Sequence, residues 1–407
     1  MDTKIVRRRY DLDWLRVLAI LTIFIYHTTR FFNSEDWQIK NQTTYFSMDV
    51  LETVLTNWIM ALIFAISGAS IFFALDKGGA GKFIKDKVLR LVVPLVTMGM
   101  VIFGAFQIYL DRLSHGEFNG TFFEFVPHYF QPGTFAWSGV HLWYLEMLFI
   151  FCLVFTPLFL WLKRGVGQHV LASSGDLLAS RWGIYLLTLP TILCLTLTNG
   201  DSFLGDTSWG GGSILTHATF FLSGFLIISH EGLQKEIQRF RWISLAFVLI
   251  LFVTIFSVVI AVGYPPIGTP LYILGRILWG LWSWCWVLAI LGFGMKHLNF
   301  NKPVLYYANE AVLPFYILHH PVLLFVGYFV VQSPIPGLLK FLVIDAVSFV
   351  IIMVLYACLV RPFNGTRYLF GMKFLVRTPV ARNKNRRQPD YIHPTSVVLE
   401  MKNDKQN

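Results

Sequence analysis

Long apolar stretches alternate with short polar ones along almost the whole chain. Windows of about 18 to 25 predominantly apolar residues, long enough to cross a hydrocarbon core of about 30 Å as a helix, recur along it. We place ten of them, at residues 12–32, 52–75, 90–110, 141–162, 182–198, 213–229, 242–263, 271–293, 312–331 and 338–360. The pattern predicts an all-α fold, a polytopic transmembrane helical bundle of about ten spans.

The end of the chain differs in composition from the rest. Polar and basic residues dominate there, and such a segment has too little apolar surface to form a packed core. We therefore predict a membrane-embedded domain over residues 1–375 and a basic, disordered cytoplasmic tail over residues 376–407.

The overall composition narrows the class of protein. Of the 407 residues, 55% are hydrophobic and only 14% are charged, whereas a soluble domain of this length needs more charge to cover its surface. The four cysteines lie in apolar stretches without the spacing of a metal site, which indicates buried free thiols. A soluble globular enzyme and a disulfide-stapled secreted domain are both excluded.

Lysine and arginine are distributed unevenly between alternate connecting segments. Basic clusters precede the first window, follow the second and fourth windows and fill the chain end, whereas the intervening segments carry mainly Asp and Glu. Because positively charged loops stay in the cytoplasm, this bias predicts that both termini are cytoplasmic. The formal net charge of +10 follows from this topology and suits contact with anionic membrane lipid, so no nucleic-acid partner is expected.

The first apolar window contains two ionisable side chains, Arg16 and His27. A charged residue at the bilayer centre costs about 2.5–3.5 kcal/mol on insertion scales, so such residues usually face a bundle interior or a polar cavity. At about 100° per residue, the spacing of Arg16 and His27 places them on one helix face, about 16 Å apart. The imidazole of His27, with an ordinary pKa of about 6.5, can remove a proton from an alcohol. A histidine that only packs against a neighbouring helix is the alternative.

Two adjacent histidines, His319 and His320, precede Pro321 in the ninth window. Neighbouring helical residues point about 100° apart, so we expect only one of the two to face the same cavity as His27. Proline removes a backbone donor and loosens the helix locally, as often happens near functional sites. Metal binding is the less favoured alternative and no metal is expected, because the ligand spacing of a zinc site is missing.

Further polar residues stand inside other windows. His141 opens the fourth window at its outer end and Glu146 follows within the same window. A carboxylate inside a span needs a partner, which makes Glu146 a candidate functional residue. His141 has either a direct role in a site or the role of an interfacial cap. Asp345 and Arg276 lie inside other windows and also need partners, and we expect some of these groups to pair with one another.

Lys87 and Arg90 lie three residues apart where the chain enters the third window from the cytoplasm. Two such cations on one helix face can hold phosphate oxygens, with arginine supplying the forked contact. Ordinary cytoplasmic-side residues produce the same pattern. The spacing alone leaves both interpretations open.

In combination, these segments resemble the acyltransferase-3 family of integral membrane acyltransferases. The pair Arg16-x10-His27 is similar to the start of that family, and KDKVLRLVVP resembles its R-x-x-R-x-x-x-P motif. Lys87 stands where arginine is usual, which keeps the charge and loses the bidentate geometry. Residues 64–75, 141–151 and 306–325 resemble signatures that come later in the sequences of that family. The resemblance spans roughly residues 10 to 375 and is closest to the branch associated with succinylating periplasmic glucans.

This resemblance implies an activity, a donor and an acceptor. The donor is cytoplasmic acyl-CoA (acetyl-CoA or succinyl-CoA), the acceptor is a hydroxyl of an extracytoplasmic carbohydrate, glycolipid or lipid-linked glycan, and the location is the plasma (inner) membrane. By position it implies His27 as general base, Arg16 and His319 as further catalytic residues, and Lys87 and Arg90 as ligands of the coenzyme A phosphates. We expect the acceptor to contact His141, Glu146 and His320.

Transport is the competing interpretation. Intramembrane Arg, His, Asp and Glu also mark proton-coupled carriers and flippases for glycans or lipid-linked sugars. The two halves of the chain show no convincing internal repeat, which counts against a secondary transporter. A catalytically inactive sensor or scaffold on the same fold is a third interpretation.

Overall fold

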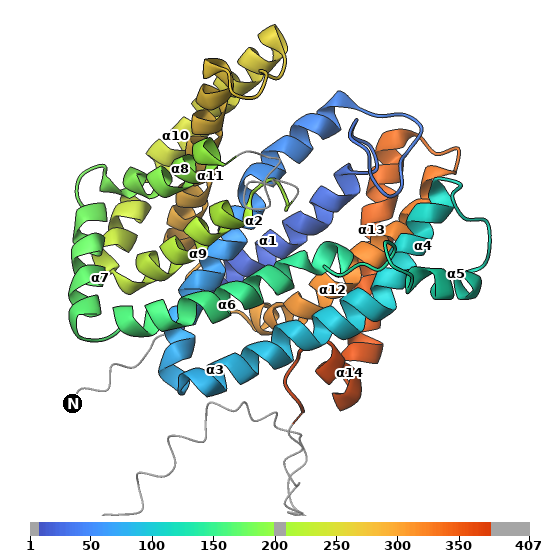
Figure 1. Cartoon of the computed structure of the whole chain (residues 1–407), viewed down its shortest axis with the longest axis horizontal. Coiled ribbons are helices and arrows are strands. Elements are labelled where there is room, and N and C mark those ends of the chain that lie inside the picture. The colour runs from blue at the N-terminus through green and yellow to red at the C-terminus, as the bar shows by residue number, and fades with distance from the viewer. Residues whose placement is uncertain (1–7, 199–208, 376–407) are drawn as a thin grey trace, which may run out of the picture. The chain divides into compact units, whose positions relative to one another are not determined.

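Apolar helices make up most of the protein (Figure 1). The computed structural model describes residues 8–198 and 209–375, and within these ranges it contains helices and no β-strand. The predicted tail, 376–407, lies outside the described residues. Eight helical segments are long and apolar enough to cross a membrane: α1 (Tyr10–Thr29), α2 (Phe46–Ala74), Ala80–Ser114, Val140–Leu162, α10 (Glu231–Val262), α11 (Pro270–His297), α12 (Pro303–Val331) and Gly337–Val360.

Two of the ten predicted windows differ from a simple span. The fifth window corresponds to the second of two helical segments that meet at a bend of 119°, α7 (Gly165–Leu178) and Gly183–Leu197. Most of the second segment is α8 (Thr188–Leu197). The bend contains Trp182 at a φ of 69°, a conformation uncommon for a non-glycine residue. The sixth window is α9 (Ile214–Ser229), an apolar helix shorter than a span. The all-helical membrane fold is confirmed, with eight spans in the described residues, or nine with the bent pair.

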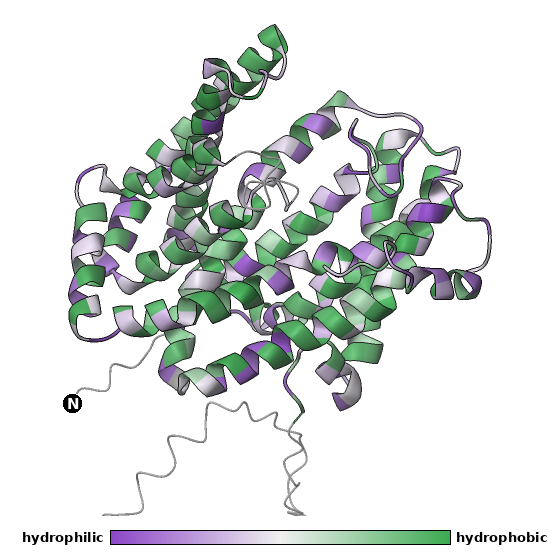
Figure 2. Ribbon diagram, in the orientation of Figure 1, coloured by the Kyte–Doolittle hydropathy of each residue, from purple (hydrophilic) through white to green (hydrophobic). Residues whose placement is uncertain are grey.

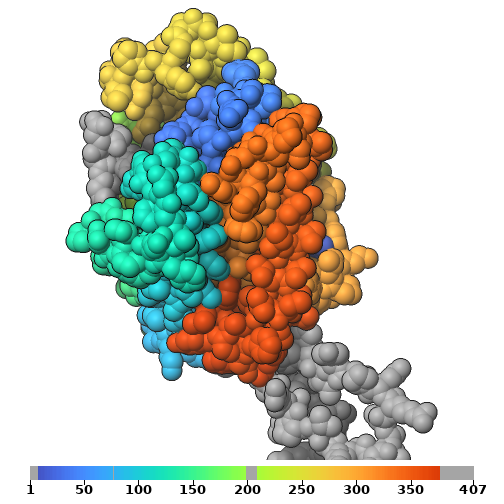
Figure 3. Space-filling view, turned by 90° about the vertical axis from the view of Figure 1, so that its right-hand side faces the viewer, coloured from blue at the N-terminus to red at the C-terminus, as the bar shows by residue number. Residues whose placement is uncertain are grey.

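Three helices form the centre of the bundle. The buried share of the apolar window is 78% in α12, 67% in α2 and 61% in α11, against 6% in α10. Since α10 has the highest mean hydropathy of the spans, its exposed side chains suit contact with lipid. Figure 2 shows that apolar residues cover the helices and that hydrophilic ones gather in connecting segments. Figure 3 shows α12 and α13 (Gly337–Leu355), in orange, beside α4 (Gly104–Ser114), in cyan.

The helices α2 and α9 approach each other closely because glycines stand at their contact. A Cβ added to Gly68 would lie 1.8 Å from the carbonyl oxygen of Phe221, and one added to Gly224 would lie 1.9 Å from that of Ala65. Small residues allow helix backbones to pack against each other inside a membrane. The contact fixes α2, which contributes residues to both cavities described below.

The third span is not a regular α-helix. It begins as α3 (Ala80–Lys87), continues through two π-helical segments, Val88–Val92 and Leu95–Phe103, and ends as α4. A π-helical turn contains an extra residue and changes which side chains share a face. Two further short helices, α5 (Phe122–Tyr129) and α14 (Asn364–Leu369), also lie outside the spans. The helix α6 (Trp143–Leu162) forms most of the fourth span.

Candidate active site

Two cavities lie along the same four helices, α1, α2, α6 and α12. The first, about 520 Å³, is lined by Arg16, Lys87 and Arg90, and we call it the basic cavity. The second, about 610 Å³, is lined by His27, His141 and His320 among others, and we call it the histidine cavity. On α1 the lining passes from Arg16 in the basic cavity to His27 in the histidine cavity. Both side chains therefore lie on a cavity-facing side of that helix, as their spacing predicts.

Tyr316 on α12 lines both cavities. Its side chain is buried, and its hydroxyl donates a hydrogen bond of 2.6 Å to the carbonyl oxygen of His141. This bond ties the middle of α12 to the start of the fourth span. Tyr316 is thus part of the wall between the basic cavity and the histidine cavity.

Four histidines from three spans form a cluster beside the histidine cavity. The ring centroid of His27 lies 4.6 Å from that of His320 and 5.2 Å from that of His319. His141 stacks on His320 with centroids 4.7 Å apart. His320 lines the histidine cavity, whereas His319 lines neither cavity, as far as the described residues define them. Only one of these two adjacent histidines thus faces the cavity, as the step of about 100° between neighbouring helical residues predicts, although both rings lie against His27.

Gln107 on α4 holds two of these histidines. It is fully buried, and its amide oxygen lies 2.9 Å from Nδ1 of His141 and 2.6 Å from Nδ1 of His320. Its amide nitrogen donates to the carbonyl oxygen of Phe103 at 2.9 Å, which turns the amide oxygen toward the two rings. Gln107 was not among the residues predicted from the sequence. The available signal was a lone amide in an apolar helix, since such a group needs a partner when buried.

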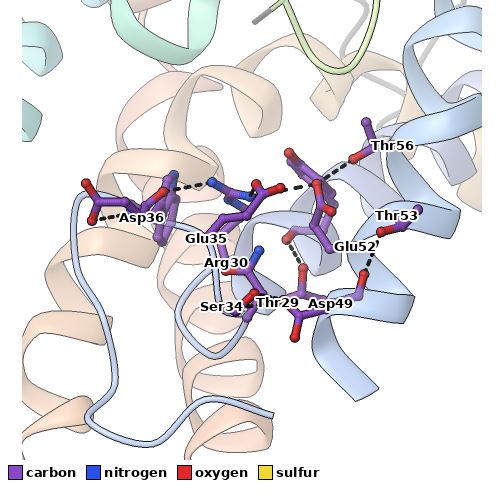
Figure 4. Close-up of polar contacts among 12 residues, drawn as sticks. Thr29, Arg30, Ser34, Glu35, Asp36, Asp49, Glu52, Thr53 and Thr56 are labelled. Carbon is purple, nitrogen blue, oxygen red and sulfur yellow. Dashed lines mark hydrogen bonds and ion pairs between the residues drawn. The ribbon is translucent and has the colours of Figure 1, made fainter. Parts of the chain in front are cut away.

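A charged group borders the histidine cavity where α1 ends (Figure 4). Arg30 pairs with Glu35 in the connecting segment and, at 3.8 Å, with Glu52 of α2. Glu52 also accepts a hydrogen bond of 2.8 Å from the hydroxyl of Thr56. These contacts hold the segment between α1 and α2 against α2. They were not predicted from the sequence, because neither acid stands at helical spacing from Arg30.

Aromatic rings complete the lining of the histidine cavity. They are Tyr26, Trp37, Trp143, Trp279 and Tyr264. The ring of Trp37 is nearly parallel to that of His27, with centroids 6.1 Å apart and planes at 15°. Aromatic walls with a few polar groups between them suit a ligand that has both apolar faces and hydroxyl groups. A sugar ring is such a ligand.

The basic cavity is lined by more cations than acids. Among the described residues, Arg16, Lys87, Arg90, Arg367 and Lys373 face it together with one acid, Glu310. Glu310 is paired with Arg367 at 2.9 Å. Arg16 donates to the hydroxyl of Ser70 at 2.7 Å, which holds the guanidinium toward α2. Lysine and arginine in such a cavity can bind the phosphate groups of a ligand.

Other predicted residues lie elsewhere. Glu146 is on α6 and, among the described residues, lines neither cavity. Asp345 accepts a hydrogen bond of 2.6 Å from Thr28, and Arg276 donates to the carbonyl oxygen of Leu195 at 2.9 Å. Among the described residues, neither of them pairs with the other or with Glu146. The expectation that some of these charged groups pair with one another was therefore wrong, because a hydroxyl and a backbone carbonyl lie nearer.

The histidine cluster has no arrangement of a metal site. Within the described ranges, no group of three or more His, Cys, Asp or Glu side chains is placed to hold a metal ion. Nδ1 of both His141 and His320 is directed at the amide oxygen of Gln107, so neither nitrogen is free to bind a metal ion. The geometry offers imidazoles for proton transfer.

Comparisons with known proteins agree with this chemistry. The profile of the acyltransferase-3 family, described as an acyltransferase domain, matches residues 9–360. The glucans biosynthesis protein C of Salmonella heidelberg is 22% identical over 344 residues, covering 82% of this chain and 87% of the relative. The protein of the same name from Salmonella paratyphi B is 23% identical over the same length and shares. No solved structure matches the chain.

The family match covers the histidine cavity, the histidine cluster and all but the last of the described helices. It also covers the lining of the basic cavity except for Arg367, Gly371, Met372 and Lys373. The chain therefore belongs to the acyltransferase-3 family and is a multi-pass membrane enzyme that transfers acyl groups.

Proposed function

We propose that this enzyme moves an acetyl or succinyl group from cytoplasmic acyl-CoA to a hydroxyl of an extracytoplasmic glycan or glycolipid. The observation that carries the proposal is the pair of cavities that share Tyr316, one lined by cations and the other by imidazoles. Transfer from a phosphorylated thioester to an alcohol needs a site for each. The name of the relatives, glucans biosynthesis protein C, supports a glucan as acceptor.

In this proposal His27 is the general base of the reaction. The acceptor hydroxyl gives its proton to His27 while its oxygen attacks the carbonyl carbon of the thioester. The carbon–sulfur bond then breaks, and the leaving thiolate takes up the proton that His27 accepted, so that an ester and free coenzyme A result and His27 is neutral again. His27 suits this role because it lines the cavity that also holds the aromatic walls.

Arg16, Lys87 and Arg90 bind the donor in this scheme. Coenzyme A carries several phosphate groups, and an arginine can hold two oxygens of one phosphate while a lysine acts as a point charge. Arg16 lies nearest to His27 along α1 and guides the thioester arm past Tyr316. His141 and His320 contact the acceptor in the histidine cavity, and Glu146 has no role in this scheme.

The proposed orientation has the basic cavity toward the cytoplasm of a plasma (inner) membrane. In this proposal the bent pair α7–α8 and the short helix α9 each form one span, which gives ten spans. Because ten is an even number, both termini then lie in the cytoplasm. The alternation of basic and acidic connecting segments supports this arrangement.

The test is transfer by the purified protein in lipid vesicles. We expect labelled acetyl-CoA or succinyl-CoA to leave covalent label on a glucan, and His27→Ala to lower transfer by about 10²-fold or more. The matched control is His169→Ala, at an exposed site on α7, which leaves transfer unchanged. Glucan that crosses the vesicle wall without label indicates a carrier instead. Full activity of a folded His27→Ala variant contradicts the assignment of the base.

A further inference from the structure

Two buried imidazole nitrogens in the histidine cluster have no hydrogen-bond partner among the described residues. They are Nδ1 of His27 and Nε2 of His319. The two rings are neighbours, with centroids 5.2 Å apart and planes at 38°. Buried polar atoms are normally paired, so two orphaned nitrogens on adjacent rings call for an explanation.

The protonation of His319 is fixed by its other nitrogen. Nδ1 of His319 lies 2.5 Å from the carbonyl oxygen of Tyr316, and a carbonyl oxygen only accepts hydrogen bonds. Nδ1 therefore carries the proton. In the neutral ring Nε2 then has a free lone pair and is an acceptor.

The same argument applies to His320, the other ring against His27. Its Nδ1 donates to the amide oxygen of Gln107, which leaves Nε2 of His320 without a proton. Both neighbours thus offer His27 only acceptor nitrogens. Since Nε2 of His319 can only accept, the two orphaned nitrogens can satisfy each other only if Nδ1 of His27 carries the proton, which leaves Nε2 of the neutral His27 ring without one.

We propose that His319 is a positioning residue of the acyl transfer. Its Nε2 accepts the Nδ1 proton of His27, directly or through one water molecule, and keeps Nε2 of His27 ready to take the proton of the acceptor hydroxyl. A base oriented by a third group is the arrangement found in other acyl-transferring sites. The inference rests on the proposed function, and it gives His319 a role that suits its absence from the cavity lining.

The first test compares two replacements of His319. In His319→Gln the side-chain oxygen can replace Nε2 as the acceptor, whereas His319→Leu has a similar volume and no acceptor. We expect His319→Leu to lower kcat about 10²-fold, as a misplaced catalytic group does, with KM values for both substrates nearly unchanged. His319→Gln should restore most of kcat. Equal kcat values in the two variants overturn the proposal.

The second test needs no variant that might fail to fold. In protein labelled with ¹⁵N-histidine, NMR distinguishes a nitrogen that carries a proton from one that does not. We expect the His27 proton on Nδ1 in the wild-type protein, and finding it on Nε2 overturns the proposal.

Failure of this inference can be told apart from failure of the proposed function. If His27→Ala is inactive while His319→Leu keeps full kcat, only the positioning role falls. If His27→Ala keeps full activity, the base itself is wrongly assigned.

Discussion

Polar side chains inside the helical bundle are held by specific hydrogen-bond partners. Arg16 is bound by Ser70, Asp345 by Thr28, and two histidines share Gln107. Hydrogen bonds of this kind contribute modestly when formed, but a buried donor left without an acceptor costs about 1–3 kcal/mol. Gln107 is the most exacting case because one oxygen serves two rings.

Gln107→Leu removes that shared acceptor. We expect a loss of unfolding free energy of about 1–3 kcal/mol for each unpaired donor, together with slower acyl transfer because two rings are no longer fixed. Thermal unfolding in detergent and the transfer assay measure the two effects. The matched control is Gln332→Leu, whose exposed amide also donates to a carbonyl four residues earlier, at 2.6 Å. Similar losses in both variants contradict the role of Gln107.

Lys40, in the segment between α1 and α2, makes the stability of the protein depend on pH. Its amine donates to the carbonyl oxygens of Arg30 and Asn33 at 2.7 and 2.6 Å. Burial, with a further contribution from the charge of Arg30, lowers the pKa of Lys40 from 10.5 to about 8. Between these values the unfolded chain binds more protons than the folded one, so stability rises with pH.

The expected result is a difference between two unfolding curves. Relative to Lys40→Met, the wild-type protein should gain stability from about pH 8 to 10.5, the window between the two pKa values, and show no change below it. Subtracting the stability of Lys40→Met from that of the wild-type protein at each pH cancels the contribution of the other titrating groups. Thermal unfolding in buffered detergent provides the measurement, and a difference that is flat throughout would falsify the lowered pKa.

Among the helices, α2 has the most demanding position because it lines both cavities and touches the backbone of α9. Gly224→Ala places a methyl group 1.9 Å from the carbonyl oxygen of Ala65, so the two helices have to separate. We expect a loss of about 1–3 kcal/mol, the usual effect of overpacking, and weaker binding of the acceptor. The control is Gly275→Ala on α11, where an added Cβ meets open space. Equal stability of both variants would show that the contact is not tight.

Regular helices were the part of this protein that the sequence could predict. Apolar windows located the spans because lipid contact demands them. The spacing of Arg16 and His27 predicted a common face because α1 is an uninterrupted α-helix. The rule that separated His319 from His320 needed only the 100° step between neighbours.

Irregular turns and distant contacts account for what the sequence could not predict. The π-helical segments Val88–Val92 and Leu95–Phe103 change the helix register before Gln107. Counting about 100° per residue along the helix from Lys87 therefore cannot predict the direction of the Gln107 side chain. Its partner His320 is 213 residues away along the chain, and no local pattern encodes that contact. The missed pairing of Arg30 with Glu52 likewise joins the segment just after α1 to α2.

In the whole protein, the proposed reaction gives the separation of the two cavities a chemical use. A thioester exposed to water next to a general base is open to hydrolysis, and an enzyme avoids this side reaction by excluding water. The wall at Tyr316 keeps the basic cavity apart from the histidine cavity. The donor would then meet His27 only when its thioester arm passes that wall.

Tyr316→Ala opens this wall, and Tyr316→Phe keeps it while removing the hydrogen bond of 2.6 Å to the His141 carbonyl. We expect Tyr316→Ala to raise the ratio of acyl-CoA hydrolysis to glucan acylation, because water reaches the thioester from the acceptor side. Tyr316→Phe should leave that ratio close to the wild-type value. Truncating a buried aromatic ring costs about 3–5 kcal/mol, so rates are normalised to folded protein. Free coenzyme A released with and without glucan gives the ratio, and an unchanged ratio in Tyr316→Ala means that Tyr316 is not the partition.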